Sequence, residues 1–276
     1  MTEAIFQYAS DLHLEFGMNS RYMKVYGLTK SADILLLAGD VGYLEKLRIE
    51  HDPFFDWCSR HYRETVIVPG NHEYYRDPVA REGHQDGIPV EKTLVNYEHK
   101  LRQNVRYLNN RSIVIDDVEI FATTLWSVVP QSEWITVENG MNDCSEILFN
   151  GHHLKASDFL ILHEICKNWL AEALEKSTAK KKVVLTHHCP STDQAFSRYK
   201  TTGGLSSAFL VDMHDFIAEH DIDIWLYGHT HFNGGSGTVV PSRNPNGTKL
   251  LCNQLGYIQL AEDRFGFNPS SCFVGP

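Results

Sequence analysis

The chain has 276 residues, of which 42% are hydrophobic and 22% charged, and its formal net charge at pH 7 is -10. This composition is typical of a globular protein and excludes a disordered or fibrous chain. The acidic balance argues against long nucleic acid as a partner, because an acidic surface repels a phosphate backbone unless a local basic patch overrides it. The six cysteines contain no CxxC pair, which argues against a zinc ribbon and a compact disulfide framework.

The N-terminal segment MTEAIFQYASDLH lacks a basic region followed by a long apolar stretch, and it has the pattern of a core strand. We therefore predict a cytoplasmic protein. No apolar stretch approaches the ~20 residues that a membrane-spanning helix needs, so the sequence predicts no membrane partner.

Short apolar segments rich in β-branched residues alternate with helical patterns along most of the chain. The expected strands are 4–8, 33–38, 65–68, 112–115, 119–122, 182–185 and 223–226. The expected helices are 53–62, 90–101, 158–174 and 206–219. This alternation favours α/β layering.

Two regions depart from the alternation. Residues 127–157 are the least regular segment and form a lid or an insertion, or else an ordinary surface excursion. The C-terminal part has strand-like segments at 238–240, 249–251 and 257–260 separated by turns. We expect it to form an antiparallel stretch without long helices.

Polar side chains directly follow the first two expected strands. Asp11 and His13 come after 4–8, and residues two apart near a strand end point the same way, so both can bind one metal. Alone, such a pair is weak, because a turn aspartate beside a surface histidine is common. Asp40 ends the apolar run 34–38, where open α/β sheets place their ligand sites. A solvated turn is the alternative for Asp40.

Three further polar clusters also follow expected strands. They are Gly70-Asn71-His72-Glu73 after 65–68, His187-His188 after 182–185, and Gly228-His229-Thr230-His231 after 223–226. Asn71 offers an amide oxygen beside an imidazole, and His229 and His231 are spaced to face one site. Five such clusters, each at the end of a strand, favour one shared metal site over coincidence.

This ordered set of motifs, from residue 11 to residue 231, resembles the calcineurin-like metallophosphoesterase superfamily. The resemblance implies one domain over residues 1–276, folded as a four-layer α/β/β/α sandwich of two mixed β-sheets flanked by helices. It also implies two divalent metal ions. One would be held by Asp11, His13 and His231, the other by Asn71, His187 and His229, with Asp40 bridging both. His188 is the alternative to His187, because the motif needs one histidine here.

The resemblance further implies a hydrolase of phosphate mono- or diesters. A hydroxide that bridges the two metals would attack phosphorus in line with the departing oxygen, and His72 would assist the leaving group. The mixed ligand set accepts Mn, Fe, Zn, Ni or Co, so the sequence does not select the metal. Glu73 is either a partner of a ligand or a solvated loop carboxylate.

Asp40 is followed by Val41-Gly42-Tyr43, whereas phosphoprotein phosphatases of this superfamily have Asp-Arg-Gly at this place, so that subclass is not expected. The motifs resemble instead the bacterial small-molecule phosphohydrolases, and the expected partner is a small phosphate ester. One alternative is a nuclease with the same binuclear site, which would need a basic groove. Another is a non-catalytic metal-binding scaffold, a role that the presence of His72 disfavours.

Overall fold

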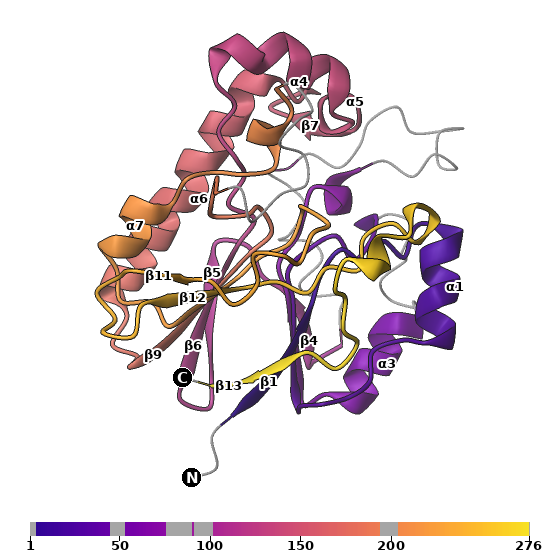
Figure 1. Cartoon of the computed structure of the whole chain (residues 1–276), viewed down its shortest axis with the longest axis vertical. Helices are drawn as coiled ribbons and strands as arrows, with labels where there is room; N and C mark the ends of the chain where they lie inside the picture. The colour runs from indigo at the N-terminus through magenta and orange to yellow at the C-terminus, as the bar shows by residue number, and fades with distance from the viewer. Residues whose placement is uncertain (1–3, 45–52, 76–89, 91–101, 194–203, 276) are drawn as a thin grey trace.

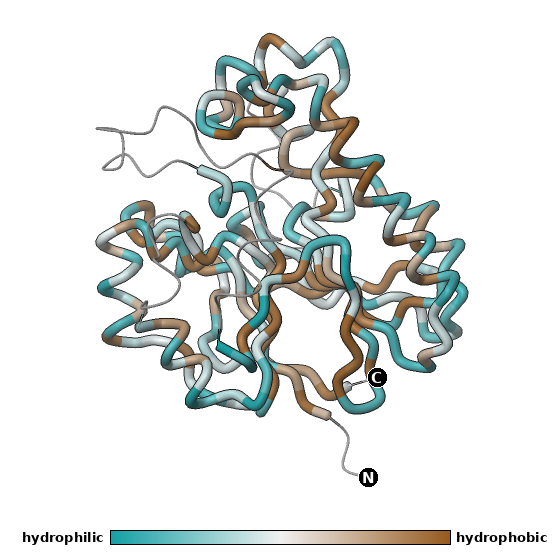
Figure 2. The backbone as a smooth tube through the Cα atoms, turned by 180° about the vertical axis from the view of Figure 1, so that it is seen from behind, coloured by the Kyte–Doolittle hydropathy of each residue, from teal (hydrophilic) through white to brown (hydrophobic). Residues whose placement is uncertain are grey.

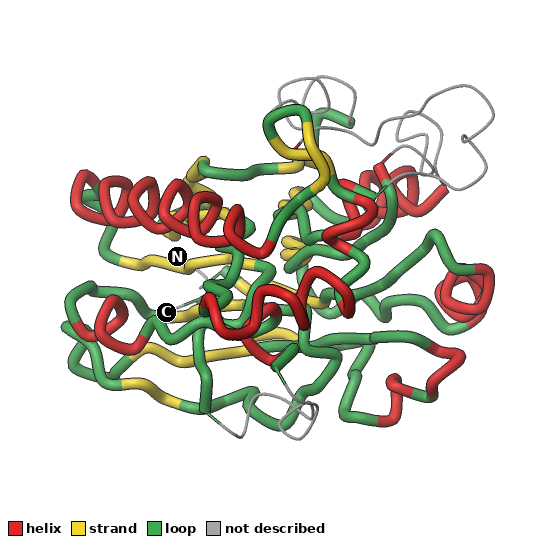
Figure 3. Tube along the Cα trace, turned by 90° about the horizontal axis from the view of Figure 1, so that it is seen from above, coloured by secondary structure: helices red, strands yellow, loops and turns green. Residues whose placement is uncertain are grey.

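The computed structural model describes residues 4–44, 53–75, 90, 102–193 and 204–275. Two large mixed sheets lie at its centre. Helices α6 (Ala156–Lys176) and α7 (His214–Ala218) lie on one side, and α1 (Gly17–Val25) and α3 (Pro53–His61) lie on the other (Figure 1). The view from above shows the strands between these groups of helices (Figure 3). The helix expected at 90–101 lies, except for residue 90, outside the described residues.

The first sheet has the strand order β13-β1-β2-β3-β4. Its strands are β1 (Ile5–Ala9), β2 (Ile34–Leu37), β3 (Glu64–Ile67), β4 (Val105–Tyr107) and β13 (Cys272–Val274). β1 to β4 run parallel, and β13 pairs antiparallel with β1. The carboxyl ends of β1, β2 and β3 therefore meet at one edge of this sheet.

The second sheet has the strand order β11-β12-β10-β9-β6-β5. Its strands are β5 (Arg111–Ile115), β6 (Val118–Thr123), β9 (Lys181–Thr186), β10 (Ile224–Leu226), β11 (Val239–Val240) and β12 (Thr248–Leu251). β6, β9, β10 and β12 are parallel, whereas β5 and β11 are antiparallel to their neighbours.

Alternation of side chains along the strands produces the layers. Leu36 and Val183 belong to the apolar core between the two sheets. Leu35 faces the opposite way, into a core shared with α1 (Gly17–Val25) and α3 (Pro53–His61). Val184 packs in a core shared with α6 (Ala156–Lys176) and α7 (His214–Ala218). The predicted α/β/β/α sandwich is confirmed, and hydrophobic residues run along its strands (Figure 2).

The irregular segment 127–157 contains secondary structure that the sequence did not reveal. It holds α4 (Trp134–Gly140), α5 (Asp143–Glu146) and a hairpin of β7 (Leu148–Phe149) with β8 (His152–His153). Val137 and Phe149 share an apolar core with Trp126 and with Phe159 of α6. These elements are too short to show a clear period in the sequence. The single domain and the lid role stay predictions.

Two other expectations differ from the structure, and α1 is a helix that the sequence does not predict. The strand at 257–260 is wrong: Gly256 turns the chain with φ of +70°, and Ile258–Leu260 is a short 3-10 helix. The helix at 206–219 is interrupted, because Leu210 forms a bridge to Cys189 between a 3-10 turn and α7. α1 is absent from the expectations, since only its Asn19 is buried and no apolar stripe marks it.

All six cysteines are free in the structure. Among the described helices, none is long and apolar enough to cross a bilayer.

Candidate metal centre

Each predicted site residue lies on a loop that directly follows a parallel strand. Asp11 and His13 follow β1, Asp40 follows β2, Asn71 and His72 follow β3, His187 follows β9, and His229 and His231 follow β10. All eight are buried. The two sheets thus bring five distant segments together at one edge of the sandwich.

Many of the predicted ligands have a left-handed backbone. The positive φ angles are 55° at Asp11, 49° at His13, 52° at Asp40, 71° at His229 and 49° at His231. Aspartate and histidine tolerate this region better than most residues, but it still costs roughly 1 kcal/mol or more at each position. The fold therefore stores backbone strain around the site.

Glycines before the ligands allow the loops to approach one another. A Cβ atom at Gly70 would collide with Oδ1 of Asp40, and one at Gly39 would collide with the ring of His187. A Cβ atom at Gly228 would lie 2.7 Å from Oδ2 of Asp11. The glycine in each of these motifs is therefore required by the closeness of a ligand from another strand.

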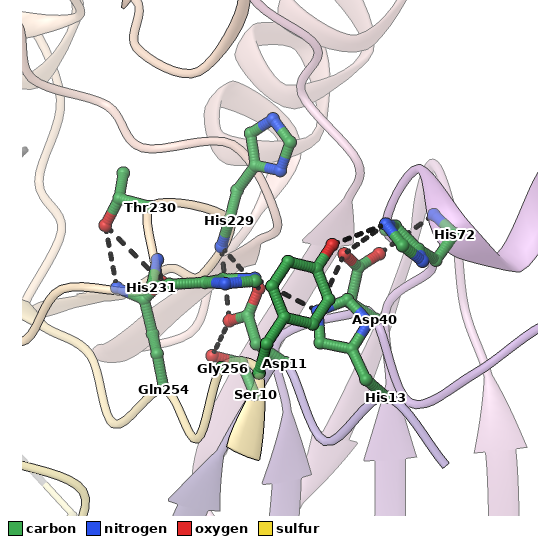
Figure 4. Close-up of polar contacts among 12 residues, drawn as sticks. Ser10, Asp11, His13, Asp40, His72, His229, Thr230, His231, Gln254 and Gly256 are labelled. Carbon is green, nitrogen blue, oxygen red and sulfur yellow. Dashed lines mark hydrogen bonds and ion pairs between the residues drawn. The ribbon is translucent and has the colours of Figure 1, made fainter. Parts of the chain in front are cut away.

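One group of ligand atoms comes from Asp11, His13, Asp40 and His231, all within 4.8 Å of one another. Nε2 of His13 lies 3.0 Å from Nε2 of His231 and 3.7 Å from Oδ2 of Asp40. Nε2 of His231 lies 3.3 Å from Oδ1 of Asp11. These side chains point toward one another (Figure 4).

A second group comes from Asp40, His187 and His229, again within 4.8 Å. Nε2 of His187 lies 3.0 Å from Oδ1 of Asn71, 3.1 Å from Nδ1 of His229 and 3.4 Å from Oδ1 of Asp40. Asp40 belongs to both groups, with one carboxylate oxygen toward each. This is the arrangement that a bridging ligand requires.

Hydrogen bonds at the Nδ1 atoms of His13 and His231 fix the tautomers of the two rings. Nδ1 of His13 lies 3.0 Å from Glu15, and Nδ1 of His231 lies 2.6 Å from Glu262. Because a carboxylate accepts hydrogen bonds, we assign the N–H to Nδ1 in both rings. When both rings are neutral, as metal ligands are, the two Nε2 atoms, only 3.0 Å apart, both carry lone pairs.

The second pair follows the same rule. Nδ1 of His187 donates to the carbonyl of Ala38 at 2.8 Å, and Nε2 of His229 donates to the carbonyl of Ala208 at 3.3 Å. Nε2 of His187 and Nδ1 of His229 therefore face each other as lone pairs at 3.1 Å. Such contacts repel unless a cation lies between them, so this donor set fits two borderline divalent metals.

The electrostatics of the site agree with metal binding. Burial lowers the pKa of His13 and of His187 to about 4, which keeps both rings neutral as ligands must be. Burial raises the pKa of Asp11, but the hydrogen bond and charge of His231 outweigh it and bring it to about 2. Burial and the charges of Glu73 and Asp11 raise the pKa of Asp40.

His231 is different, because burial lowers its pKa but Asp11 and Glu262 raise it to about 9. In the metal-free site, a proton on His231 thus supplies the positive charge that the first group needs.

Of the two adjacent histidines, His187 is the one that joins a ligand group. Nδ1 of His188 lies 3.3 Å from the carbonyl of Thr124, and its Nε2 is buried without a hydrogen bond. The His188 ring packs against that of His229 at 4.3 Å. The geometry thus favours His187 over His188, while its role as a ligand stays a prediction.

His72 lies beside the two groups. Its Nδ1 is 2.8 Å from Glu15, and its Nε2 is 4.0 Å from Oδ2 of Asp40. The backbone N–H of His72 donates to Oδ1 of Asp40 at 2.9 Å, and its ring stacks on Tyr75 at 4.3 Å. These contacts orient the ring next to the expected bridging ligand.

Buried carboxylates outside the predicted ligand set hold the ligands in place. Glu73 accepts from the backbone N–H groups of Asp40, Val41 and Gly70 at 2.7 to 2.9 Å, so the solvated alternative is wrong. Glu15 contacts both His13 and His72, as described above. Its spacing, two residues after His13, is the signal that could have revealed it.

Asp143 is the site residue that the irregular segment contributes. Its Oδ1 accepts from Nδ2 of Asn71 at 2.8 Å and from the hydroxyl of Tyr75. Because Nδ2 of Asn71 is held in this way, its Oδ1 faces His187. No local pattern marks Asp143 in the sequence.

Replacing Glu262 by glutamine should weaken metal binding. Without the carboxylate, His231 loses the partner that fixes its tautomer, and outer-partner changes of this kind cost about 10- to 100-fold in metal affinity. Competition with a chelator measures the affinity. The matched control is Glu172→Gln on α6, where the carboxylate side chain is 69% exposed. Equal affinities in the two variants would contradict the role of Glu262.

Comparison with known proteins identifies the family of the chain. The family model of the calcineurin-like phosphoesterases matches residues 8–233. An uncharacterised protein of Acanthamoeba polyphaga mimivirus, L509, is 29% identical over 96% of this chain and 94% of its own length. The fold is similar to that of the phosphopantetheinyl hydrolase PptH from Mycobacterium tuberculosis, with a TM-score of 0.68, 17% identity and coverage of 97% of this chain and 95% of that one. The chain therefore belongs to the calcineurin-like phosphoesterases, a family of phosphoric ester hydrolases.

Proposed function

We propose that this protein hydrolyses small phosphate mono- or diesters with two divalent metal ions. One ion is held by Asp11, His13 and His231, the other by Asn71, His187 and His229, and Asp40 bridges them. The observation that supports this most strongly is the convergence of histidine ring nitrogens at 3.0 and 3.1 Å in two groups that share Asp40.

When bound, two divalent cations lower the pKa of a water molecule and neutralise charge on the phosphoryl oxygens. The protein's own part is to orient the ligands through Glu15, Glu262 and Asp143. His72 assists the departing oxygen: with its Nδ1–H held by Glu15, it donates from Nε2 when it carries both protons.

A small substrate is favoured by the net charge of -10, which disfavours the polyanionic substrate of a nuclease. The presence of His72 beside the ligands disfavours the non-catalytic scaffold. The proposed location of the protein is the cytoplasm.

Chelator-treated protein should be inactive, and reloading with manganese should restore hydrolysis of 4-nitrophenyl phosphate or bis(4-nitrophenyl) phosphate. Parallel reloading with Fe, Zn, Ni and Co ranks the metals. A panel of phosphomonoesters, cyclic nucleotides, dinucleotides, phospholipid head groups and phosphopantetheinyl esters then identifies the substrate class. If the metal-loaded protein hydrolyses none of these esters, the proposal is wrong.

A further inference from the structure

The Tyr257 side chain covers one face of the candidate metal centre. Its ring centroid lies 4.6 Å from that of His13 and 4.6 Å from that of His231. Its hydroxyl lies 3.2 Å from Nε2 of His72. Nε2 is the atom from which His72 would donate, so the Tyr257 hydroxyl lies directly in front of the proposed proton donor.

The backbone on both sides of Tyr257 is fixed to the loop that carries Asp11 and His13. The N–H of Gly256 donates to the carbonyl of Asp11 at 3.1 Å. The buried side chain of Asn19 donates to the carbonyl of Gly256 at 2.8 Å and accepts from the N–H of Ile258 at 3.2 Å. The same amide group of Asn19 donates to the carbonyl of Leu12 at 3.0 Å. Asn19 thus fixes the backbone around Tyr257 to the loop that carries Asp11 and His13.

The position of Tyr257 is also fixed from its own C-terminal side. Its N–H donates to Glu262 at 2.7 Å, and the same carboxylate oxygen contacts Nδ1 of His231. Gly256 has φ of +70°, and a Cβ atom there would lie 2.6 Å from that oxygen. These contacts fix the backbone that carries Tyr257, so its hydroxyl is held in front of His72.

Tyr257 and Glu262 themselves lie beyond residue 233, where the match to the family model ends.

We propose that Tyr257 is a further catalytic residue, which passes a proton from His72 to the departing oxygen. The inference rests on the proposed function. The bond between phosphorus and the departing oxygen breaks, and its electron pair stays on that oxygen. The hydroxyl proton of Tyr257 moves to this oxygen while the Nε2 proton of His72 moves to Tyr257. Tyr257 ends as a neutral phenol, and His72 has given up one proton.

The test compares phenyl phosphate, whose oxygen leaves poorly without a proton, with 4-nitrophenyl phosphate, whose oxygen leaves readily. In the manganese-loaded enzyme, Tyr257→Phe should lower kcat about 10²-fold for phenyl phosphate and far less for 4-nitrophenyl phosphate. The matched control is Tyr62→Phe, because the buried Tyr62 hydroxyl donates to Gln7 at 2.9 Å in the core beside α3. This control should leave the ratio of the two rates unchanged.

A double variant separates the proton relay from a structural role. In a His72→Asn background the relay is already broken, so Tyr257→Phe should have little further effect on phenyl phosphate. Equal losses for both esters, the same loss in both backgrounds, or a loss of bound metal would assign Tyr257 a structural role and overturn the inference. If the wild-type enzyme hydrolyses neither ester, nor any other in the panel, it is the proposed function that fails.

Discussion

Asp40→Ala should abolish phosphoesterase activity. The Asp40 carboxylate lies 3.7 Å from Nε2 of His13 and 3.4 Å from Nε2 of His187, so its loss removes the anion that both ligand groups share. Metal ions stabilise the charge of a phosphoryl transition state by several kcal/mol, which corresponds to a rate loss of about 10³-fold or more. The measurement is kcat for 4-nitrophenyl phosphate together with the metal content by elemental analysis.

Asp221→Ala provides the matched control for this change. Asp221 is a carboxylate with a 52% exposed side chain that pairs with Lys182, and it takes no part in either ligand group. We expect wild-type activity from it, because Asp221 lies outside both ligand groups and its own side chain is half exposed. An Asp40→Ala enzyme that keeps its activity would contradict the binuclear assignment.

His72→Asn should lower kcat by roughly 10²- to 10³-fold while both metals stay bound. Nδ1 of His72 contacts Glu15, and its Nε2 remains 4.0 Å from Asp40, so the predicted ligand set does not need this ring. Asparagine retains a polar side chain but cannot deliver the proton. The same two measurements, kcat and metal content, distinguish a proton donor from a ligand.

His61→Asn on α3 is the control, since His61 is exposed and its ring contacts the carbonyl and the ring of Trp57 on its own helix. If His72→Asn loses a metal ion, His72 binds metal together with His13 and Glu15, which form a third group of clustered ligand atoms. That result would move His72 from the donor role to the ligand set.

The sequence predicts the fold class. It also marks the eight site residues that the structure places at one edge of the sandwich, because polar residues after apolar strands form a strong local pattern. It does not distinguish His187 from His188 with the same clarity. Both follow one strand, and their side chains leave it in different directions. The packing of β9 between β6 and β10 determines that His187 turns its Nε2 toward Oδ1 of Asn71 and Nδ1 of His229.

The supporting residues could not be predicted because their contacts join parts of the chain that are far apart. Tyr257 and His72 are separated by 185 positions in the sequence, and Asn71 and Asp143 by 72. The expected strand at 257–260 shows the same limit. Its apolar pattern is a local property, whereas the turn at Gly256 and the contact of Tyr257 with Glu262 determine its conformation.

The left-handed backbone of the five ligands has a consequence for the life of the protein in a cell. At roughly 1 kcal/mol or more each, their combined strain is comparable to the 5–15 kcal/mol by which a typical domain resists unfolding. Metal binding opposes this strain, by about 2.7 kcal/mol for a site at a metal concentration 100 times its dissociation constant. We therefore expect a chain that has not acquired its ions to open more often and to be degraded sooner. Metal supply would then influence how much of this protein persists, as well as how much of it is active.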